Sequence, residues 1–354
     1  MFPQTKHLPK IVVCCLLAFA IMPLAAFADN PHTRPFGDVR VLAPVPSPGF
    51  PEGIAVRGNT VYVAGPASFD TAGLPASYVI AYDTRTGATQ RTYTIQGEVL
   101  AAPHANSCIA FDDAGRLYVV NIQLGIVRID LGSGEQTVYA PPVQQFNPFV
   151  PALPNDIAFD PEGNLYLTDS LQATIWRIPP GGGTPQVWFQ DPVLVTNFSV
   201  NGIRLSPDST RIFFSVTSDT APGPPPTPFT GGRIYSLPLV DAPTAADLQL
   251  FHQYNGEAPD GIVFGRSGNL YVMLAAPGNS GISILRPNGT EITQLHNTTD
   301  PFFPYDSPAN AAFDKHGSLL VTNHAFFTMN PANFTVLDVY VGDKGAPLSK
   351  PDLP

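Results

Sequence analysis

Short apolar segments separated by polar turns recur along the chain. Each copy of the pattern has a polar residue, an apolar triplet, a turn rich in Asp, Gly and Asn, and then a β-branched or aromatic run. Two apolar segments joined by such a turn predict a β-hairpin. The sequence contains six copies, which open at Glu52, Ser107, Asn155, Asn201, Asp260 and Ala309.

The repeat predicts the fold. The copies recur about every 50 residues, as propeller blades do. Most are followed by a third alternating segment, such as 78–83 or 174–178, and then by a fourth, outer one. We therefore predict an all-β, six-bladed β-propeller. The last blade has no outer strand after 336–341, so we expect the unassigned N-terminal segment 38–42 to complete it, which closes the ring and removes exposed sheet edges.

The N-terminus has the layout of a cleavable secretory signal. Two lysines precede an apolar run at 11–24, and Ala-Phe-Ala ends at Ala28. Cleavage after Ala28 would leave residues 29–354 as a single propeller domain in a secreted or periplasmic protein. No later stretch is long and apolar enough to cross a bilayer. Cys108 would be the only cysteine of the mature chain, so no internal disulfide can form. The apolar core must therefore stabilise the mature chain.

The charge balance excludes some partners. The chain has 18 basic and 28 acidic residues, for a net charge of −10. Such a surface repels phosphate backbones and anionic lipids, so we expect neither nucleic acid nor membrane partners, and we expect a monomer. We interpret the Pro-rich stretches 141–151 and 221–230 as loops, because the repeat resumes in register after each. In a eukaryotic host four Asn-x-Ser/Thr triplets would be glycosylation sites, at Asn197, Asn288, Asn297 and Asn333.

The residue that opens each copy carries the candidate chemistry. In a propeller the innermost strand starts at the central channel, so the six opening residues should form a ring around the axis. Hard divalent cations bind carboxylate and amide oxygens, and the ring offers two of each. No cysteine or histidine occupies the ring, which excludes a soft-metal site. Asn and Asp are also common turn residues, and for any one of them alone this interpretation stays open.

The blade-opening motifs resemble a known family. Leu153-Pro154-Asn155-Asp156, Val200-Asn201-Gly202 and Ala258-Pro259-Asp260-Gly261 are similar to motifs of the senescence-marker-protein and gluconolactonase family, to which paraoxonases and diisopropyl fluorophosphatase are related. Pro51-Glu52-Gly53 resembles the first-blade glutamate of that family. The resemblance covers nearly all of the mature chain. It implies a cation on the axis, calcium or else zinc, manganese or magnesium, with Glu52, Asn155, Asn201 and Asp260 as ligands.

The resemblance also implies an activity, the hydrolysis of a small lactone or related ester with the cation as Lewis acid. Asp260 is then the candidate base or nucleophile. His104 lies in a segment similar to one that contributes a catalytic histidine in paraoxonases, and His324 ends the second strand of blade six, where related phosphotriesterases place a pocket histidine. Either histidine can instead be an ordinary loop residue. The channel is also expected to be lined by Ser107, Asp156 and Asn310.

Two other functions fit the same sequence. One is a non-catalytic propeller in which the ion stiffens the hub and the loops bind a polymer or a protein partner. The other is a lyase or condensing enzyme resembling strictosidine synthase, a group in which the metal ligands are usually lost. Their retention here favours hydrolysis. The loops at 66–76 and 221–230 follow no pattern that identifies a substrate.

Overall fold

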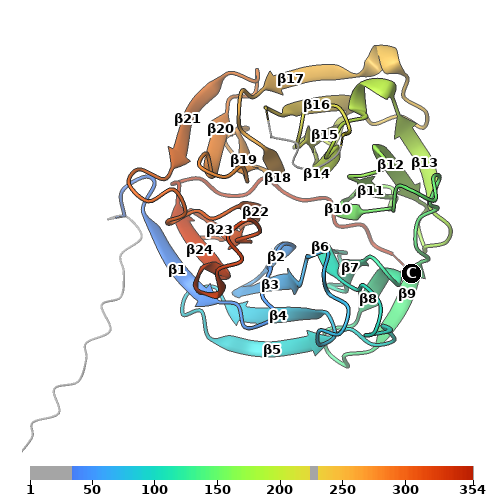
Figure 1. Cartoon of the computed structure of the whole chain (residues 1–354), viewed down its shortest axis with the longest axis horizontal. Coiled ribbons are helices and arrows are strands. Elements are labelled where there is room, and N and C mark those ends of the chain that lie inside the picture. Colours follow the sequence, from blue (N-terminus) through green and yellow to red (C-terminus); the bar gives the residue numbers. More distant parts are fainter. Residues whose placement is uncertain (1–33, 224–229, 354) are drawn as a thin grey trace, which may run out of the picture. The chain divides into compact units, whose positions relative to one another are not determined.

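Six antiparallel sheets of four strands each surround a central axis (Figure 1). This computed structural model describes residues 34–223 and 230–353. The sheets confirm the predicted six-bladed all-β propeller. The predicted signal lies outside the described residues, among which no helix is long and apolar enough to cross a membrane.

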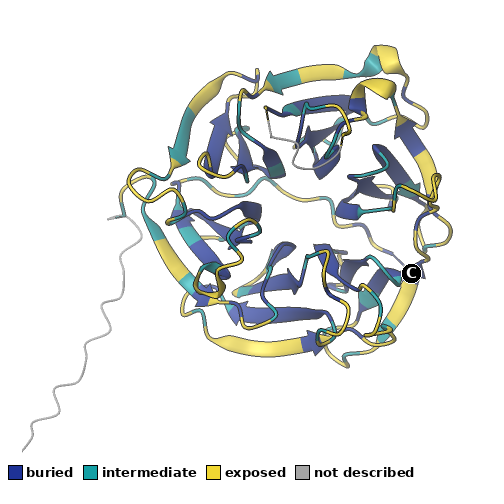
Figure 2. Ribbon diagram, viewed as in Figure 1, coloured by how far each residue is buried: buried dark blue, intermediate teal, exposed yellow. Residues whose placement is uncertain are grey.

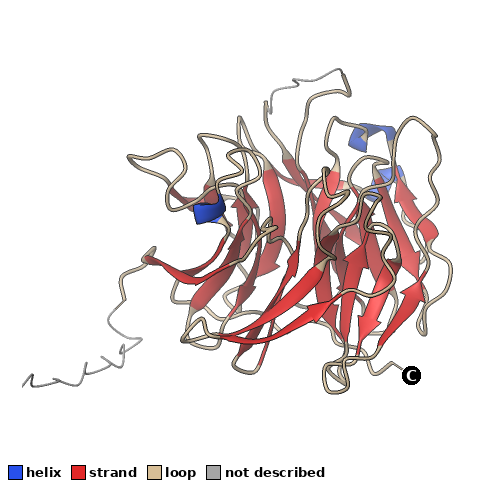
Figure 3. Cartoon of the chain, turned by 60° about the horizontal axis from the view of Figure 1, so that its bottom comes forward, coloured by secondary structure: helices blue, strands red, loops and turns tan. Residues whose placement is uncertain are grey.

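Each blade runs outward from the axis, with consecutive strands paired as neighbours. Blades one to three contain β2 (Ile54–Arg57), β3 (Thr60–Gly65), β4 (Tyr78–Asp83) and β5 (Thr89–Thr94); β6 (Asn106–Phe111), β7 (Leu117–Asn121), β8 (Gly125–Ile129) and β9 (Gln136–Ala140); and β10 (Pro154–Phe159), β11 (Leu165–Asp169), β12 (Thr174–Ile178) and β13 (Gln186–Gln190). Blades four and five contain β14 (Val200–Leu205), β15 (Arg211–Val216), β16 (Arg233–Pro238) and β17 (Gln249–Gln253); and β18 (Pro259–Phe264), β19 (Leu270–Leu274), β20 (Gly281–Leu285) and β21 (Glu291–His296). Within residues 34–223 and 230–353, three short 3-10 helices lie in connecting loops, at Pro192–Leu194, Ala245–Asp247 and Pro331–Asn333 (Figure 3).

The sixth blade joins the two ends of the ring. Its strands, from the axis outward, are β22 (Pro308–Phe313), β23 (Ser318–Asn323), β24 (Thr335–Tyr340) and β1 (Val39–Pro44). The N-terminal strand therefore completes the last blade, as the sequence predicts. Arg34 holds this closure, because its guanidinium donates hydrogen bonds to the Asp338 carboxylate on β24 at 2.7 and 2.8 Å.

The core lies between the blades. Six clusters of buried apolar side chains fill the six gaps between neighbouring sheets, each drawing on the facing strands of two blades. The inner three strands of each blade are mostly buried, whereas the outermost strands are largely exposed (Figure 2). The alternation of apolar and polar residues therefore weakens toward the axis, where both faces of a strand contact another blade.

The C-terminal segment crosses one mouth of the channel (Figure 1). Gly345 forms a bridge with Gly265 of blade five, and Arg116 of blade two donates a hydrogen bond of 2.6 Å to the Leu353 carbonyl. This segment and the lower ends of the inner strands enclose a cavity of about 490 Å³. A second cavity, on the opposite side, contains the candidate site.

Candidate metal centre

The inner strands turn their opening residues toward the axis by an irregularity in pairing. In β10 the register with β11 shifts between Pro154 and Ile157, which leaves Asn155 and Asp156 outside the ladder. The inner strands of blades two, four, five and six show the same shift. Such a bulge re-aims side chains, and here it creates two layers along the axis. The first layer holds the opening residue of each blade, and the second holds the residue after it.

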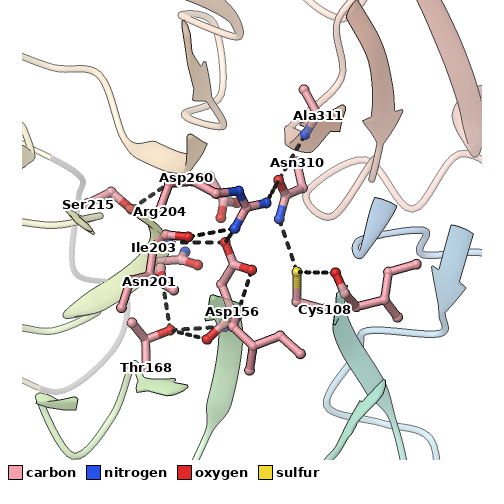
Figure 4. A network of polar contacts seen from close by, with 12 residues as sticks. Cys108, Asp156, Thr168, Asn201, Ile203, Arg204, Ser215, Asp260, Asn310 and Ala311 are labelled. Carbon is pink, nitrogen blue, oxygen red and sulfur yellow. Dashed lines mark hydrogen bonds and ion pairs between the residues drawn. The ribbon is translucent and has the colours of Figure 1, made fainter. Parts of the chain in front are cut away.

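Hydroxyl groups stabilise these irregular segments and connect neighbouring blades. The Thr168 hydroxyl of β11 accepts a hydrogen bond from the backbone N–H of Asp156 at 2.9 Å and donates to the Asn201 carbonyl of the next blade at 2.6 Å. Thr322 does the same between blades six and one, donating to the Glu52 carbonyl at 2.7 Å. Ser215 donates to the Asp260 carbonyl at 2.7 Å. The backbones of Asn201 and Asp260 are therefore fixed from the preceding blade (Figure 4), and so is that of Glu52.

A cavity of about 420 Å³ opens above the first layer. The structure brings all four candidate ligands, Glu52, Asn155, Asn201 and Asp260, to its wall together with Ser107. The sixth ring position is occupied by Ala309, which is buried and offers no polar side chain.

The two amides are oriented by neighbouring hydroxyls. Asn155 donates from Nδ2 to the Ser170 hydroxyl at 3.2 Å, and Asn201 donates from Nδ2 to the Thr217 hydroxyl at 2.9 Å. This leaves the amide oxygens as the free acceptors. The Oδ1 of Asn201 is buried and has no hydrogen-bond partner among the described residues. A buried polar atom without a partner is costly, and a bound cation would satisfy it.

The two carboxyl groups lie in a buried site that disfavours their charged forms. Burial, reinforced by the nearby charge of Asp156, raises the pKa of Glu52 to about 8. Burial and the charge of Glu52 raise the pKa of Asp260 well above its usual range. Two acids whose charged forms are disfavoured together indicate a position where positive charge would be stabilised.

His324 contacts this site from blade six. Its Nε2 lies 2.8 Å from the Ala67 carbonyl, so in the neutral ring Nε2 carries the proton and Nδ1 is the free acceptor. Nδ1 lies 3.8 Å from Oε2 of Glu52, and the side chain lines the cavity. Burial lowers the pKa of His324 to about 4, which keeps the ring neutral.

His104 lies elsewhere. It is fully buried and does not belong to the cavity wall that the described residues form. Its Nδ1 lies 2.9 Å from the Ala102 carbonyl and its Nε2 lies 3.1 Å from the Pro75 carbonyl. Both ring nitrogens thus contact loop backbone, and the geometry gives no support to the catalytic role that the resemblance implies for His104.

A network of polar side chains occupies the second layer, beneath the site (Figure 4). Arg204 donates from Nη1 to the Asp156 carboxylate at 2.7 Å and from Nη2 to the Asn310 amide oxygen at 3.2 Å. The Asn310 Nδ2 in turn lies 3.4 Å from the sulfur of Cys108. Asp156 and Asn310 therefore lie below the cavity rather than in its wall, and Asp156 is already paired. Glycines occupy the other three positions of this layer, Gly53, Gly202 and Gly261.

Sequence reasoning missed Arg204, although a signal was present. The middle residue of the apolar triplet is alanine or valine in five copies of the repeat and arginine in the fourth. A charge at a position that is buried or half-buried in every other blade indicates a buried partner. Cys108 is fully buried, as expected for a small apolar residue, but it also contacts this polar network.

The donor set fits a hard cation. Calcium accepts carboxylate and amide oxygens as ligands, and this site offers two of each. A bound cation would also give the buried Asn201 oxygen the partner that it lacks among the described residues. Within the described residues, no group of three or more His, Cys, Asp or Glu side chains gathers as a metal site. The amides are therefore needed to complete the coordination.

The fold occurs in several solved structures. A calcium-binding protein, regucalcin from Agrobacterium tumefaciens, superposes with a TM-score of 0.62 at 18% identity, covering 88% of this chain and 97% of its own. A gluconolactonase from Xanthomonas campestris gives 0.56 at 17% identity, covering 86% and 98%. A catalytically inactive virginiamycin B lyase from Staphylococcus aureus gives 0.51 at 17% identity, covering 81% and 82%. Because a hydrolase and a lyase share the architecture, the fold does not decide the chemistry.

The sequence itself gives the family. No curated protein matches the chain closely enough to count as a relative. The family profile of the SMP-30/Gluconolactonase/LRE-like region matches residues 74–325, which span most of the propeller. The chain belongs to the SMP-30/gluconolactonase/LRE-like family.

Proposed function

We propose that this protein is a metal-dependent hydrolase that opens lactones or related esters. The observation that carries the proposal is the convergence of Glu52, Asn155, Asn201 and Asp260 on one cavity, with the buried Asn201 oxygen left without a partner. The family membership supports it, because gluconolactonases belong to the same family.

Calcium is the cation that these residues fit best. All four donors are oxygens, and two carboxylates offset the charge of a divalent ion. Zinc prefers nitrogen and sulfur ligands, and magnesium demands a stricter octahedral geometry than four side chains from four separate blades readily supply. When bound, such a cation supplies Lewis-acid stabilisation of the negative charge that grows on the substrate carbonyl oxygen.

The protein's own residues handle the protons. Nδ1 of His324 is the free acceptor at the cavity wall, held in place by the Nε2 contact with Ala67. It takes a proton as a water oxygen bonds to the carbonyl carbon. The ring C–O bond then breaks, and the leaving alkoxide receives that proton, so that the product is a hydroxy acid. Asp260 is the alternative base, since it lines the same cavity.

The cavity also limits water. The Arg204–Asp156 pair lies in the second layer, between this cavity and the one on the opposite side, so we expect substrate and water to enter from the upper mouth. A site with one entrance and apolar walls strengthens the electrostatic interactions inside it.

The test is a purified-protein assay against sugar lactones, acyl-homoserine lactones and aryl esters. It is run with and without EDTA, for the wild type, Asp260→Asn and a control, Asp241→Asn, whose side chain is 99% exposed. Turnover that EDTA and Asp260→Asn both abolish, and that Asp241→Asn leaves intact, supports the proposal. Absence of turnover on every substrate, with calcium-dependent melting retained, would instead indicate a non-catalytic propeller.

A further inference from the structure

The upper part of the cavity wall is apolar. Above the first layer, five blades contribute Phe69, Ile122, Leu171, Phe198, Phe326 and Phe327 to the wall. Among the described residues that line the cavity, Glu52, Asp260 and His324 are the only titratable ones, and none is Lys, Arg, Tyr, Trp or Gln. The space above the candidate metal centre therefore offers contact area but few hydrogen-bonding groups.

The polar side chains that do reach the wall are mostly engaged. Ser107 donates to the Pro154 carbonyl at 3.0 Å, and the Thr217 hydroxyl accepts the amide of Asn201. Asn155 is held by the Ser170 hydroxyl. Ser68 and Ser307 are the remaining hydroxyls of the described wall. A ligand that enters this cavity finds few partners for its own polar groups.

This composition opposes a polyhydroxylated substrate. A sugar lactone carries several hydroxyls, each of which must exchange water for a protein partner when it is buried. A buried hydroxyl without a partner weakens binding by about tenfold or more. An alkyl or aryl group, by contrast, gains from burial against the same wall.

The aromatic side of the wall lies next to the proposed chemistry. The ring of Phe326 packs at 5.5 Å from that of His324, and it meets Phe69 edge-on at 6.0 Å and Phe327 edge-on at 5.2 Å between centroids. The Phe326 ring is thus fixed by three neighbours. This aromatic surface therefore borders His324, the proposed base.

We infer that the substrate is a lactone or ester with an apolar alkyl or aryl substituent, not a polyhydroxylated sugar lactone. The inference rests on the proposed hydrolytic function and adds the substrate class. A cavity of about 420 Å³ is large enough for a small lactone ring with a medium-length chain.

The experiment compares γ-undecalactone with glucono-δ-lactone, by kcat/KM, in the wild type, Phe198→Ser, Leu171→Ser and the control Phe149→Ser. Phe149 is 90% exposed and lies outside the wall. We expect the alkyl lactone to be preferred by at least about 100-fold in the wild type. Each wall variant should lose about tenfold or more on the alkyl lactone, mainly through KM, and the control should match the wild type.

Calorimetric binding of the corresponding alkyl lactam, which resists hydrolysis, tests the apolar binding site separately from the hydrolytic activity. Equal or better turnover of glucono-δ-lactone would overturn the inference while leaving the hydrolase in place. Lactam binding that both wall variants weaken, without turnover of any lactone, would overturn the proposed function and retain the apolar site. Absence of both turnover and lactam binding would overturn both.

Discussion

Replacing Arg204 with methionine tests the layer that closes the channel. The Arg204–Asp156 pair is buried, with side-chain exposures of 10% and 1%, and the contact distance is 2.7 Å. Removing the guanidinium leaves the Asp156 carboxylate in the interior without its counter-charge. Breaking a buried ion pair in this way lowers the free energy of unfolding by about 3–5 kcal/mol.

The contacts of Asp156 indicate that the loss in free energy of unfolding lies near the lower end of that range. Asp156 keeps two backbone donors after the substitution, the N–H of Ile157 at 2.7 Å and the N–H of Ile203 at 3.1 Å. Methionine also fills much of the volume that the arginine stem occupied. We therefore expect a loss of about 3 kcal/mol.

A surface pair provides the matched control. Arg177 contacts Asp241 at 3.0 Å, and the Asp241 side chain is 99% exposed. Exposed pairs contribute about 0–1 kcal/mol, so Arg177→Met should change stability little. The double variant Asp156→Asn, Arg204→Met removes both charges and should recover a large part of the loss.

The assay is equilibrium unfolding in urea, followed by tryptophan fluorescence, because Trp176 and Trp188 are both buried. The prediction is wrong if the free energy of unfolding of Arg204→Met lies within about 1 kcal/mol of the wild-type value, or is no lower than that of Arg177→Met. It is also wrong if the double variant is less stable than the single one.

Three further predictions concern pH, packing and processing. The pKa of Glu52 in the folded protein, about 8, exceeds its value in the unfolded chain. The metal-free protein should therefore lose stability as the pH rises from about 4.5 to 8. Melting curves recorded with calcium should not show this loss. Gly202→Ala would place a methyl group 2.5 Å from the Asp260 carbonyl of the next blade, so it should lower stability by about 2 kcal/mol or more in urea unfolding, whereas Gly132→Ala, which meets only a side-chain oxygen at 3.3 Å, should not. We also predict export, so mass spectrometry of protein from the secreted or periplasmic fraction should find Asp29 as the first residue, and an intact N-terminus would contradict the signal prediction.

The repeat made most of the architecture predictable. A polar residue, an apolar triplet and a second apolar run recur in phase six times, and every copy became an inner hairpin. The closing strand was predictable because segment 38–42 belongs to no copy of the repeat and the sixth blade lacks an outer strand. The ring positions followed from the place of each residue within the repeat. The convergence of Asn155 and Asp260 on one cavity was therefore predictable from the sequence.

The polar network of the second layer, below the ring, was not predictable from the repeat. Arg204 occupies a position where every other copy has a small apolar residue, yet its guanidinium contacts Asp156 of blade three and Asn310 of blade six. The location of His104 depends on how its loop folds back against the Pro75 carbonyl, which no local pattern specifies. Contacts between segments far apart in sequence decide both cases.

The most direct test of the metal centre is anomalous diffraction from crystals of the mature protein grown with calcium. We predict one strong peak on the propeller axis, about 2.3–2.6 Å from side-chain oxygens of Glu52, Asn155, Asn201 and Asp260. Crystals that show no peak at this position, or a calcium ion bound only elsewhere, would contradict this prediction.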